Sequence, residues 1–250
     1  MSSYLELRQK SMQKNTAGIC AILNNIINLC MFHVDKYENN NIFIYNEELF
    51  ELFDFPLNDD NKSNYFDIEK DFLLSNFTTV SAHQAFNPIE NAKRLKIFKT
   101  FFRFKNLTYL ESLQRNFLST KVVGLHLRGT DKKNEITPPN LSKIFYEIEK
   151  ILNNNLAQKI FLSTDDHKLL NLASAEFNEN LIFFEDSIMS NNSKPIHFGE
   201  FRSQSNLQVI RDCFILSYCP YFFYSFSNVS QFALMLGLDN RQKVFCNNLL

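Results

Sequence analysis

Glycine is scarce in this chain of 250 residues, because only five are present and none of them are grouped. The P-loop and the GxGxxG dinucleotide motif both need clustered glycines, since the backbone there must pass close to phosphate groups. The sequence contains neither motif. Its composition therefore argues against P-loop NTPases and against dehydrogenases of the Rossmann type.

An excess of basic charge is also missing. Lys and Arg number 26 and Asp and Glu 27, which gives a formal charge of -1 and a pI of about 6.5. A nucleic-acid partner is therefore not expected. The first residues are polar, and no stretch approaches the roughly 18 apolar residues of a membrane span. We expect a cytoplasmic protein.

The sequence also lacks the spacings of common metal and nucleophile sites. Its five cysteines show no CxxC pair and lie in apolar runs, which is typical of reduced, buried thiols. The five histidines show no ligand spacing, and no nucleophile elbow is present. We therefore expect neither a bound metal nor any other cofactor. The cysteines are Cys20, Cys30, Cys213, Cys219 and Cys246.

The pattern that is present alternates helix and strand, which favours an α/β fold with a parallel sheet. We place a domain boundary at residue 118, so that 1–118 form one domain and 119–250 a Rossmann-like second one. A surface loop is predicted over 56–65. Strands are predicted at 42–45, 77–80, 122–127, 159–162, 181–184 and 221–224. Helices are predicted at 17–32, 47–53, in two stretches from 88 to 118, and at 141–152, 166–177, 207–218 and from 228.

Three polar clusters begin where predicted strands end: HLRGTDK at 126–132, STDD at 163–166 and SFSNVS at 225–230. In parallel α/β sheets, ligands bind beyond these carboxyl ends. Strand alternation puts His126 and Arg128 on one face together with Gly124. Arg is well shaped to grip a phosphate or carboxylate in two places, although Arg128 could instead form a structural ion pair with Asp131.

The other two clusters have both structural and functional interpretations. Asp166 is a natural N-cap for the helix that follows, which leaves Asp165 without a structural role. Ser225, Ser227 and Asn228 lie before a helix N-terminus, where amides and hydroxyls can receive an anion. An ordinary helix cap is the alternative for these residues.

The segments VVGLHLRGTDK, IFLSTDD and RDCFILSYCPYFFYSFSNVS follow one another with a characteristic spacing. In order and spacing they resemble the three motifs of the superfamily of α-1,6-fucosyltransferases and protein O-fucosyltransferases, which includes the nodulation fucosyltransferase. The resemblance covers roughly residues 120–237. It implies a GT-B-like fold of two Rossmann-like domains, the N-terminal one reduced, and inverting transfer of fucose from GDP-fucose to a glycan hydroxyl without a metal.

The resemblance also implies roles for individual residues. Arg128 matches the arginine that contacts the donor β-phosphate, and His126 the histidine of the same motif near the nucleotide. Asp212 matches an aspartate that recognises guanine. The remaining matches are Asp165 and Asp166 beside the nucleoside, and Ser227 with Asn228 at the diphosphate. Asp131 and Ser225 lie within the same motifs and are expected to contribute to substrate binding.

Two positions depart from the family pattern. Gly129 stands where core fucosyltransferases carry a second arginine, so one contact to the donor is missing. Glu135 is the acid nearest to the expected general base, but it is displaced by one position. The expected acceptor is a bacterial surface polysaccharide, with a lipid-linked glycan as one form of it.

Three other functions stay open from the sequence. The donor could be another GDP-sugar, such as a deoxyhexose or a heptose. A metal-dependent phosphohydrolase could hold Mg²⁺ through Asp131, Asp165 and Asp166. A binding module without catalytic activity is the third.

A basic and aromatic stretch, KRLKIFKTFFRFK at 93–105, interleaves cations with phenylalanines. The simpler interpretation is a helix that packs at the domain junction with solvated lysines outside. The functional alternative is peripheral contact with an anionic membrane surface or a lipid-linked acceptor.

Overall fold

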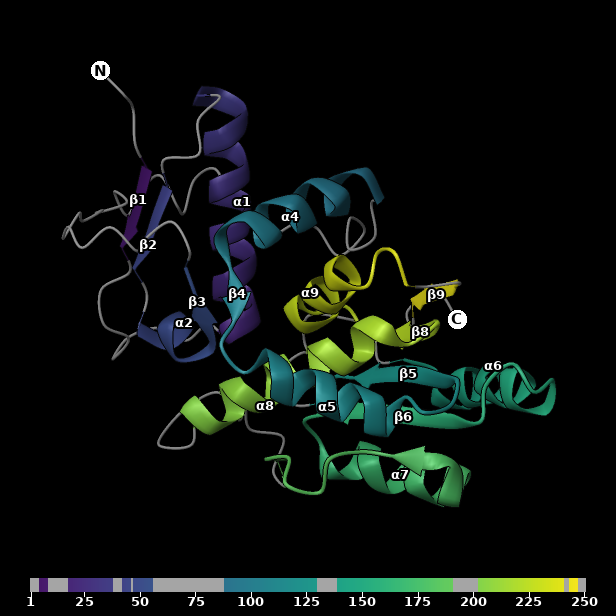
Figure 1. Cartoon of the computed structure of the whole chain (residues 1–250). Coiled ribbons are helices and arrows are strands. Elements are labelled where there is room, and N and C mark those ends of the chain that lie inside the picture. The colour runs from purple at the N-terminus through teal and green to yellow at the C-terminus, as the bar shows by residue number, and fades with distance from the viewer. Residues whose placement is uncertain are drawn as a thin grey trace. The chain divides into compact units, whose positions relative to one another are not determined.

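A computed structural model of the chain describes residues 5–8, 18–37, 42–45, 47–55, 88–129, 139–190, 202–240 and 243–246 (Figure 1). The chain divides into two compact units, Met1–Leu107 and Thr108–Leu250. The division falls at the start of helix α5 (Leu107–Phe117), whereas the boundary drawn from the sequence falls just after this helix. Helix α5 therefore belongs to the second unit.

The second unit is built on a five-stranded sheet in the order β7-β6-β5-β8-β9, and all of its neighbouring strands are parallel. The order starts with the first strand, β5, in the middle and reverses direction between β5 and β8. This is the Rossmann arrangement, so the α/β class and the Rossmann-like second half are confirmed. The strands are β5 (Val122–Leu127), β6 (Lys159–Thr164), β7 (Leu181–Ile182), β8 (Tyr221–Tyr224) and β9 (Lys243–Cys246).

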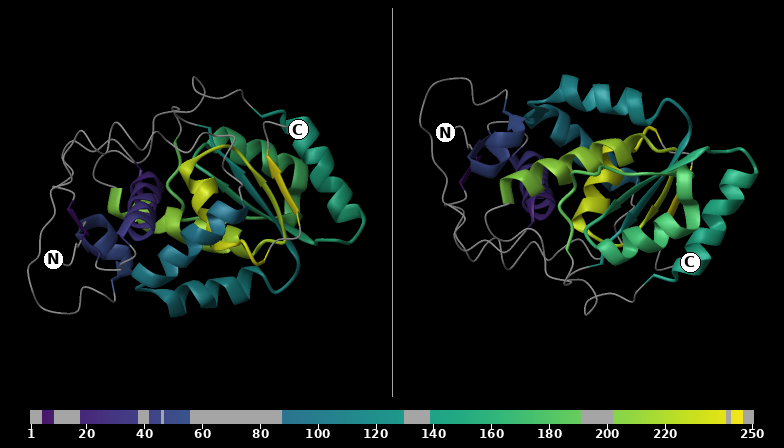
Figure 2. Two further views of the ribbon diagram at one scale, coloured as in Figure 1. Left: turned by 90° about the horizontal axis from the view of Figure 1, so that it is seen from above. Right: turned by 90° about the horizontal axis from the view of Figure 1, so that it is seen from below.

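Helices lie on both faces of this sheet (Figure 2). Val123, Leu125 and Leu127 of β5 share one buried core with helices α6 (Leu141–Asn153) and α7 (His167–Phe177). Gly124 faces the other side, where a side chain would meet Cys219 and Leu216 at the end of helix α8 (Arg202–Tyr218). This alternation is the one expected for a strand that is buried on both faces.

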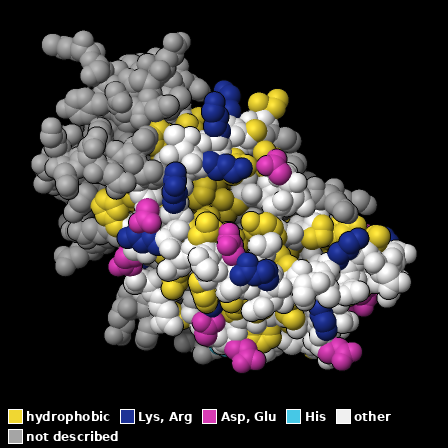
Figure 3. All heavy atoms as spheres, in the orientation of Figure 1, with side chains coloured by type: hydrophobic (Ala, Val, Ile, Leu, Met, Phe, Trp, Pro, Cys, Tyr) yellow, Lys and Arg dark blue, Asp and Glu magenta, His cyan; other side chains and the backbone are white. Residues whose placement is uncertain are grey.

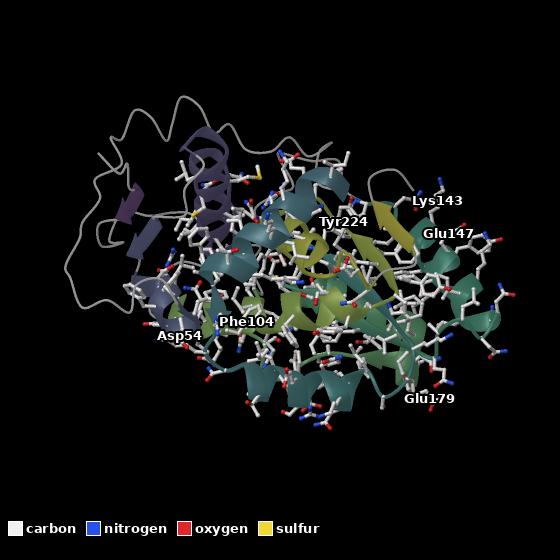
Figure 4. The ribbon with its side chains drawn as sticks, turned by 45° about the horizontal axis from the view of Figure 1, so that its top comes forward. Asp54, Phe104, Lys143, Glu147, Glu179 and Tyr224 are labelled. Atoms are coloured by element: carbon white, nitrogen blue, oxygen red, sulfur yellow. The ribbon has the colours of Figure 1, made fainter. Side chains whose placement is uncertain are left out.

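Helix α6 shows how the sequence pattern fixes one of these layers. Its apolar residues Ile144, Phe145, Ile148 and Ile151 are buried, as their spacing predicts. On the outer side Glu147 pairs with Lys150 at 2.9 Å, and the labelled Lys143 and Glu147 lie together on this helix (Figure 4). The side chain of Asn140 accepts a hydrogen bond from Lys143 N at 3.1 Å and thereby caps the helix.

The first unit contains helices α1 (Ile19–Tyr37) and α4 (Pro88–Phe101), which pack together, and α2 (Glu47–Leu52). Strand β1 (Leu5–Arg8) pairs parallel with β2 (Ile42–Tyr45), and β3 (Phe53–Asp54) pairs antiparallel with β4 (Arg103–Phe104). Asp54 and Phe104 mark this second pair in Figure 4. The described sheets of this unit have two strands each, in agreement with a reduced N-terminal domain.

The sequence missed β1, β3, β4 and β9, of which β3 and β4 have only two residues each. The predicted strand at 77–80 and loop at 56–65 lie outside the described residues. Four of the five cysteines are free and buried, as expected, and the side chain of Cys246 is not described. None of the described helices combines the length and the apolar character needed to cross a bilayer.

The basic and aromatic stretch forms most of α4 together with β4, and its burial pattern is that of a packed helix, as the simpler interpretation expects; the domain-junction part of that interpretation stays a prediction. Its phenylalanines Phe98, Phe101 and Phe102 are buried, and its lysines are exposed. Arg94 differs from the expected solvated cation, because it is 2% exposed and donates a hydrogen bond to Asn24 of α1 at 2.5 Å. On the face drawn in Figure 3, basic and acidic side chains are interspersed rather than gathered by sign.

Candidate active site

The first and third polar clusters meet at the carboxyl ends of β5 and β8. These strands are neighbours in the sheet, and His126 lies opposite Tyr224. Tyr224, the last residue of β8, is labelled in Figure 4. Beyond this pair, Ser225 N donates to His126 O at 2.9 Å, and Arg128 N donates to Ser225 Oγ at 3.3 Å. The strand order reverses at this place, which is where open α/β sheets bind their ligands.

His126 links β5 to the helix that follows β8. Its Nδ1 lies 3.0 Å from Ser230 Oγ in helix α9 (Asn228–Leu236). Burial lowers the pKa of His126 to about 3, and the positive charge of Arg128 acts in the same direction. The imidazole is therefore neutral at physiological pH. It can hold α9 in position, but it cannot supply a positive charge to a phosphate.

The start of α9 is capped by Ser227, whose Oγ accepts a hydrogen bond from Ser230 N at 3.1 Å. The cap interpretation of this serine is therefore confirmed. Ser230 Oγ also lies 3.1 Å from Ser227 Oγ and donates to Ser225 O. Asn228 is the first residue of the helix and is partly exposed. The helix thus presents its N-terminus, which carries partial positive charge, beside the end of β5.

The second cluster joins the first through Asp165. Its Oδ1 accepts a hydrogen bond from Gly129 N at 2.9 Å, and its Oδ2 lies 3.6 Å from Arg128 Nε. The pairing of Leu127 with Thr164 explains this contact. Arg128 and Asp165 directly follow these two residues, so they leave the two strands side by side. The structural ion pair considered for Arg128 is therefore formed with Asp165.

Asp166 has the structural role that its position predicts. It is the N-cap of α7, and its Oδ1 accepts a hydrogen bond from Lys168 N at 2.8 Å. Gly129 lies directly against it: a Cβ on this glycine would be 2.5 Å from Asp166 Cβ. The turn after β5 and the turn after β6 are therefore in close contact.

Asp212 lies on α8 and contacts Ser163 near the carboxyl end of β6. Ser163 Oγ donates to its Oδ2 at 2.8 Å, and Ser163 is the strand partner of His126. Among the described residues, Asp212 Oδ1 has no hydrogen-bond partner, and Arg211 Nε lies 3.7 Å from it. Burial raises the pKa of Asp212 to about 6, against the opposing effects of Arg211 and Ser163.

Arg211 is buried, and its contacts, which include one to the exposed Asp186, were not indicated by the sequence. Its guanidinium stacks on the Phe184 ring at 3.6 Å. Its Nη1 donates to both carboxylate oxygens of Asp186 at 2.8 and 2.9 Å, and its Nη2 donates to Ser187 Oγ. The segment after β7 is thereby fixed to α8. No local pattern predicted this, because the partners are about 25 residues apart and Asp186 lies in a loop.

Solved structures that match the chain include fucosyltransferases. They include NodZ α-1,6-fucosyltransferase crystallised with GDP, at 15% identity over 58% of this chain and 46% of that chain, with a TM-score of 0.40. POFUT1 in complex with GDP-fucose matches at 14% identity, over 62% of this chain and 49% of that chain, with a TM-score of 0.40. Fucosyltransferase NodZ from Bradyrhizobium matches at 15% identity, over 58% of this chain and 46% of that chain, with a TM-score of 0.38.

The matched part of each solved protein is about half of its length. No family model and no curated protein matches the sequence.

The structure brings together most of the predicted site residues, namely His126, Arg128, Asp165, Asp166, Asp212, Ser225, Ser227 and Asn228. Asp131 and Glu135 lie outside the described residues, and their roles stay predictions. Within the described ranges, no group of three or more His, Cys, Asp and Glu side chains could hold a metal ion. Asp165 and Asp166 each accept a hydrogen bond from a backbone amide.

Proposed function

We propose that the chain is an inverting, metal-independent glycosyltransferase whose donor is GDP-fucose. One observation carries the proposal: two chemically complementary groups lie at the same end of one parallel sheet. Arg128 offers a guanidinium that suits phosphate oxygens. Asp212 offers a carboxylate whose Oδ1 has no hydrogen-bond partner among the described residues and lies 3.7 Å from Arg211 Nε. Such an acceptor suits the N–H donors of guanine. Together the two groups favour a guanosine diphosphate.

The site would act mainly by positioning and by stabilising charge. In the proposed reaction a hydroxyl of the acceptor attacks the anomeric carbon of the sugar, and the bond from that carbon to the β-phosphate oxygen breaks. Negative charge then grows on the departing GDP, where Arg128 and the N-terminus of α9 would stabilise it. Glu135 is the proposed base that takes the hydroxyl proton, in line with its place after the first motif.

The proposed acceptor is a glycan hydroxyl, as in bacterial surface polysaccharides, and the first unit is proposed to provide its binding site in a reduced GT-B arrangement. The outer face of α4 supports contact with a lipid-linked acceptor or an anionic membrane, because it exposes Lys93, Lys96 and Lys99 together with Ile89. Sedimentation with anionic vesicles at low salt tests this contact. A triple Lys→Glu variant that binds the vesicles as well as the parent protein does would contradict it.

Calorimetric titration with GDP, GDP-fucose and GDP-mannose in the presence of EDTA tests the donor. We expect GDP and GDP-fucose to bind, and Arg128→Ala to abolish binding. Arg115→Ala is the matched control, since Arg115 is an exposed arginine of α5 in the same unit. Preference for GDP-mannose would move the proposal to another GDP-sugar. Absence of GDP binding by the parent protein would refute it.

A further inference from the structure

Asp165 makes one contact to Arg128, which is expected to hold the donor phosphate, and one to the neighbouring Gly129. Its Oδ1 accepts from Gly129 N at 2.9 Å, and its Oδ2 lies 3.6 Å from Arg128 Nε. The two oxygens of one carboxylate thus reach two successive residues at the end of β5. One contact acts on the backbone of the turn, and the other acts on the guanidinium.

From this geometry we infer that Asp165 is a positioning residue that acts on the donor through Arg128 and Gly129 rather than by touching the nucleoside. The inference rests on the proposed function, in which Arg128 binds the β-phosphate of GDP. It changes the role that the sequence resemblance implied for Asp165. It also accounts for the carboxylate that the sequence left without a structural task.

The side of the guanidinium that Asp165 contacts supports this role. An ion pair through Nε orients the guanidinium plane and does not use the two Nη atoms. The edge formed by Nη1 and Nη2 is one of the edges with which arginine binds a phosphate in two places. The contact is also largely shielded from solvent, because the side chains of Arg128 and Asp165 are only 17% and 14% exposed. Salt and water therefore weaken it less than they weaken a surface ion pair.

Asp165 is itself held on both sides. Ser190 N donates to Asp165 O at 2.9 Å, which ties its backbone to the segment after β7. The next residue, Asp166, is fixed as the cap of α7 and lies against Gly129. The carboxylate therefore projects from a fixed turn, and this allows it to hold Arg128 in one orientation before the donor arrives.

The test compares GDP with GMP, which lacks the β-phosphate, in calorimetric titrations. Asp165→Asn keeps an oxygen that can accept from Gly129 N and removes the charge that faces Arg128. We expect its affinity for GDP to fall on the order of tenfold and its affinity for GMP to stay the same. Glu147→Gln is the matched control, since Glu147 is paired with Lys150 on the outer side of α6.

Two further variants separate positioning from a general structural effect. In an Arg128→Lys background the Nε–H is absent, so adding Asp165→Asn should change GDP affinity less than twofold. Asp165→Glu keeps the charge and moves it by one methylene, and we expect a smaller loss of GDP affinity than for the amide. If Asp165→Asn does not fold, Asp165→Glu still tests the positioning role of Asp165.

Equal losses of GDP and GMP affinity in Asp165→Asn would overturn the inference, because they would indicate a nucleoside contact or a collapsed site. Unchanged affinity for GDP would overturn it as well. These results differ from failure of the proposed function, in which the parent protein itself binds no GDP. If the parent protein binds no GDP, both the proposed function and the positioning role of Asp165 are refuted.

Discussion

His126 is buried and Asp212 is largely buried in the same region, and burial shifts their pKa values in opposite directions. It raises the pKa of the acid to about 6 and lowers that of the base to about 3. The reason is common to both, since a poorly solvated site disfavours whichever form is charged. At neutral pH Asp212 is therefore ionised and His126 is neutral. In the proposed function this end of the sheet would offer guanine an acceptor, with the positive charge on Arg128.

Binding of GDP should weaken as the pH falls through about 6, because protonation of Asp212 removes the acceptor that guanine needs. The phosphate of GDP titrates in the same range, with a second pKa of about 6. Comparison with Asp212→Asn removes that contribution. As the pH is lowered, we expect the GDP affinity of the parent protein to fall more steeply than that of the variant. The difference in the slope of log affinity against pH should correspond to at most one proton. Identical slopes in calorimetry between pH 5 and pH 8 would contradict this.

The stability of the fold should decrease in acid because of His126. Between about pH 3 and its ordinary pKa of 6.5, His126 binds fewer protons in the folded chain than in the unfolded chain. Its contribution to the free energy of unfolding is complete above pH 6.5 and is lost as the pH falls. The loss is up to about 3 kcal/mol by pH 4. Asp212 changes stability in the opposite direction, since its raised pKa favours the folded state in acid.

Urea unfolding of the parent protein and of His126→Asn at pH 7 and pH 4.5 measures this contribution. The variant retains a side chain that can bond to Ser230 and loses the titration. We expect the difference in unfolding free energy between the two pH values to be smaller in the variant. The same difference in both proteins would show that His126 does not cause the acid sensitivity.

At the scale of elements, the turn after β5 is packed against the turn after β6. A Cβ on Gly129 would lie 2.5 Å from Asp166 Cβ and 2.6 Å from its Oδ2. Gly129→Ala should therefore displace one turn and lower the free energy of unfolding by about 1 to 3 kcal/mol. It should also weaken GDP binding, because Arg128 precedes this glycine.

Gly124→Ala is the matched substitution in the same strand. There the added Cβ would lie 3.0 to 3.2 Å from Cys219 and Leu216, far from Arg128. We expect a smaller loss of stability in urea unfolding and no change in GDP affinity. If both alanine variants weakened GDP binding equally, the effect would come from the strand rather than from contact between the two turns.

The sequence predicted most elements of the second unit because their local patterns are strong. The ranges of β5 and β8 agree with the prediction residue for residue, and the apolar face of α6 is the buried one. Helix α8 begins five residues earlier than predicted, at Arg202. Its first turns contain the buried polar residues Ser205, Asn206 and Gln208, and no apolar periodicity indicates that such a segment is buried.

At the scale of the whole molecule, the proposed transferase and the rival phosphohydrolase differ in their need for a metal. We expect transfer of fucose from GDP-fucose to continue in EDTA, since Arg128 and the start of α9 would stabilise the charge of the leaving GDP. The measurement is release of GDP in the presence of a glycan acceptor, with and without EDTA and Mg²⁺. Activity that disappears in EDTA and returns with Mg²⁺ would instead support a hydrolase whose ligands include Asp131.

The alternation of helices and strands, the polar clusters at the strand ends and the cap at Asp166 could be predicted from the order of residues. All of these depend on residues close together in the chain. The contacts of Asp165 with Arg128, of Arg211 with Asp186 and of the buried Arg94 with Asn24 depend on the folded arrangement. The partners in these contacts lie 25 to 70 positions apart. Strand order, register and helix packing bring them together, and no local pattern of residues encodes those relations.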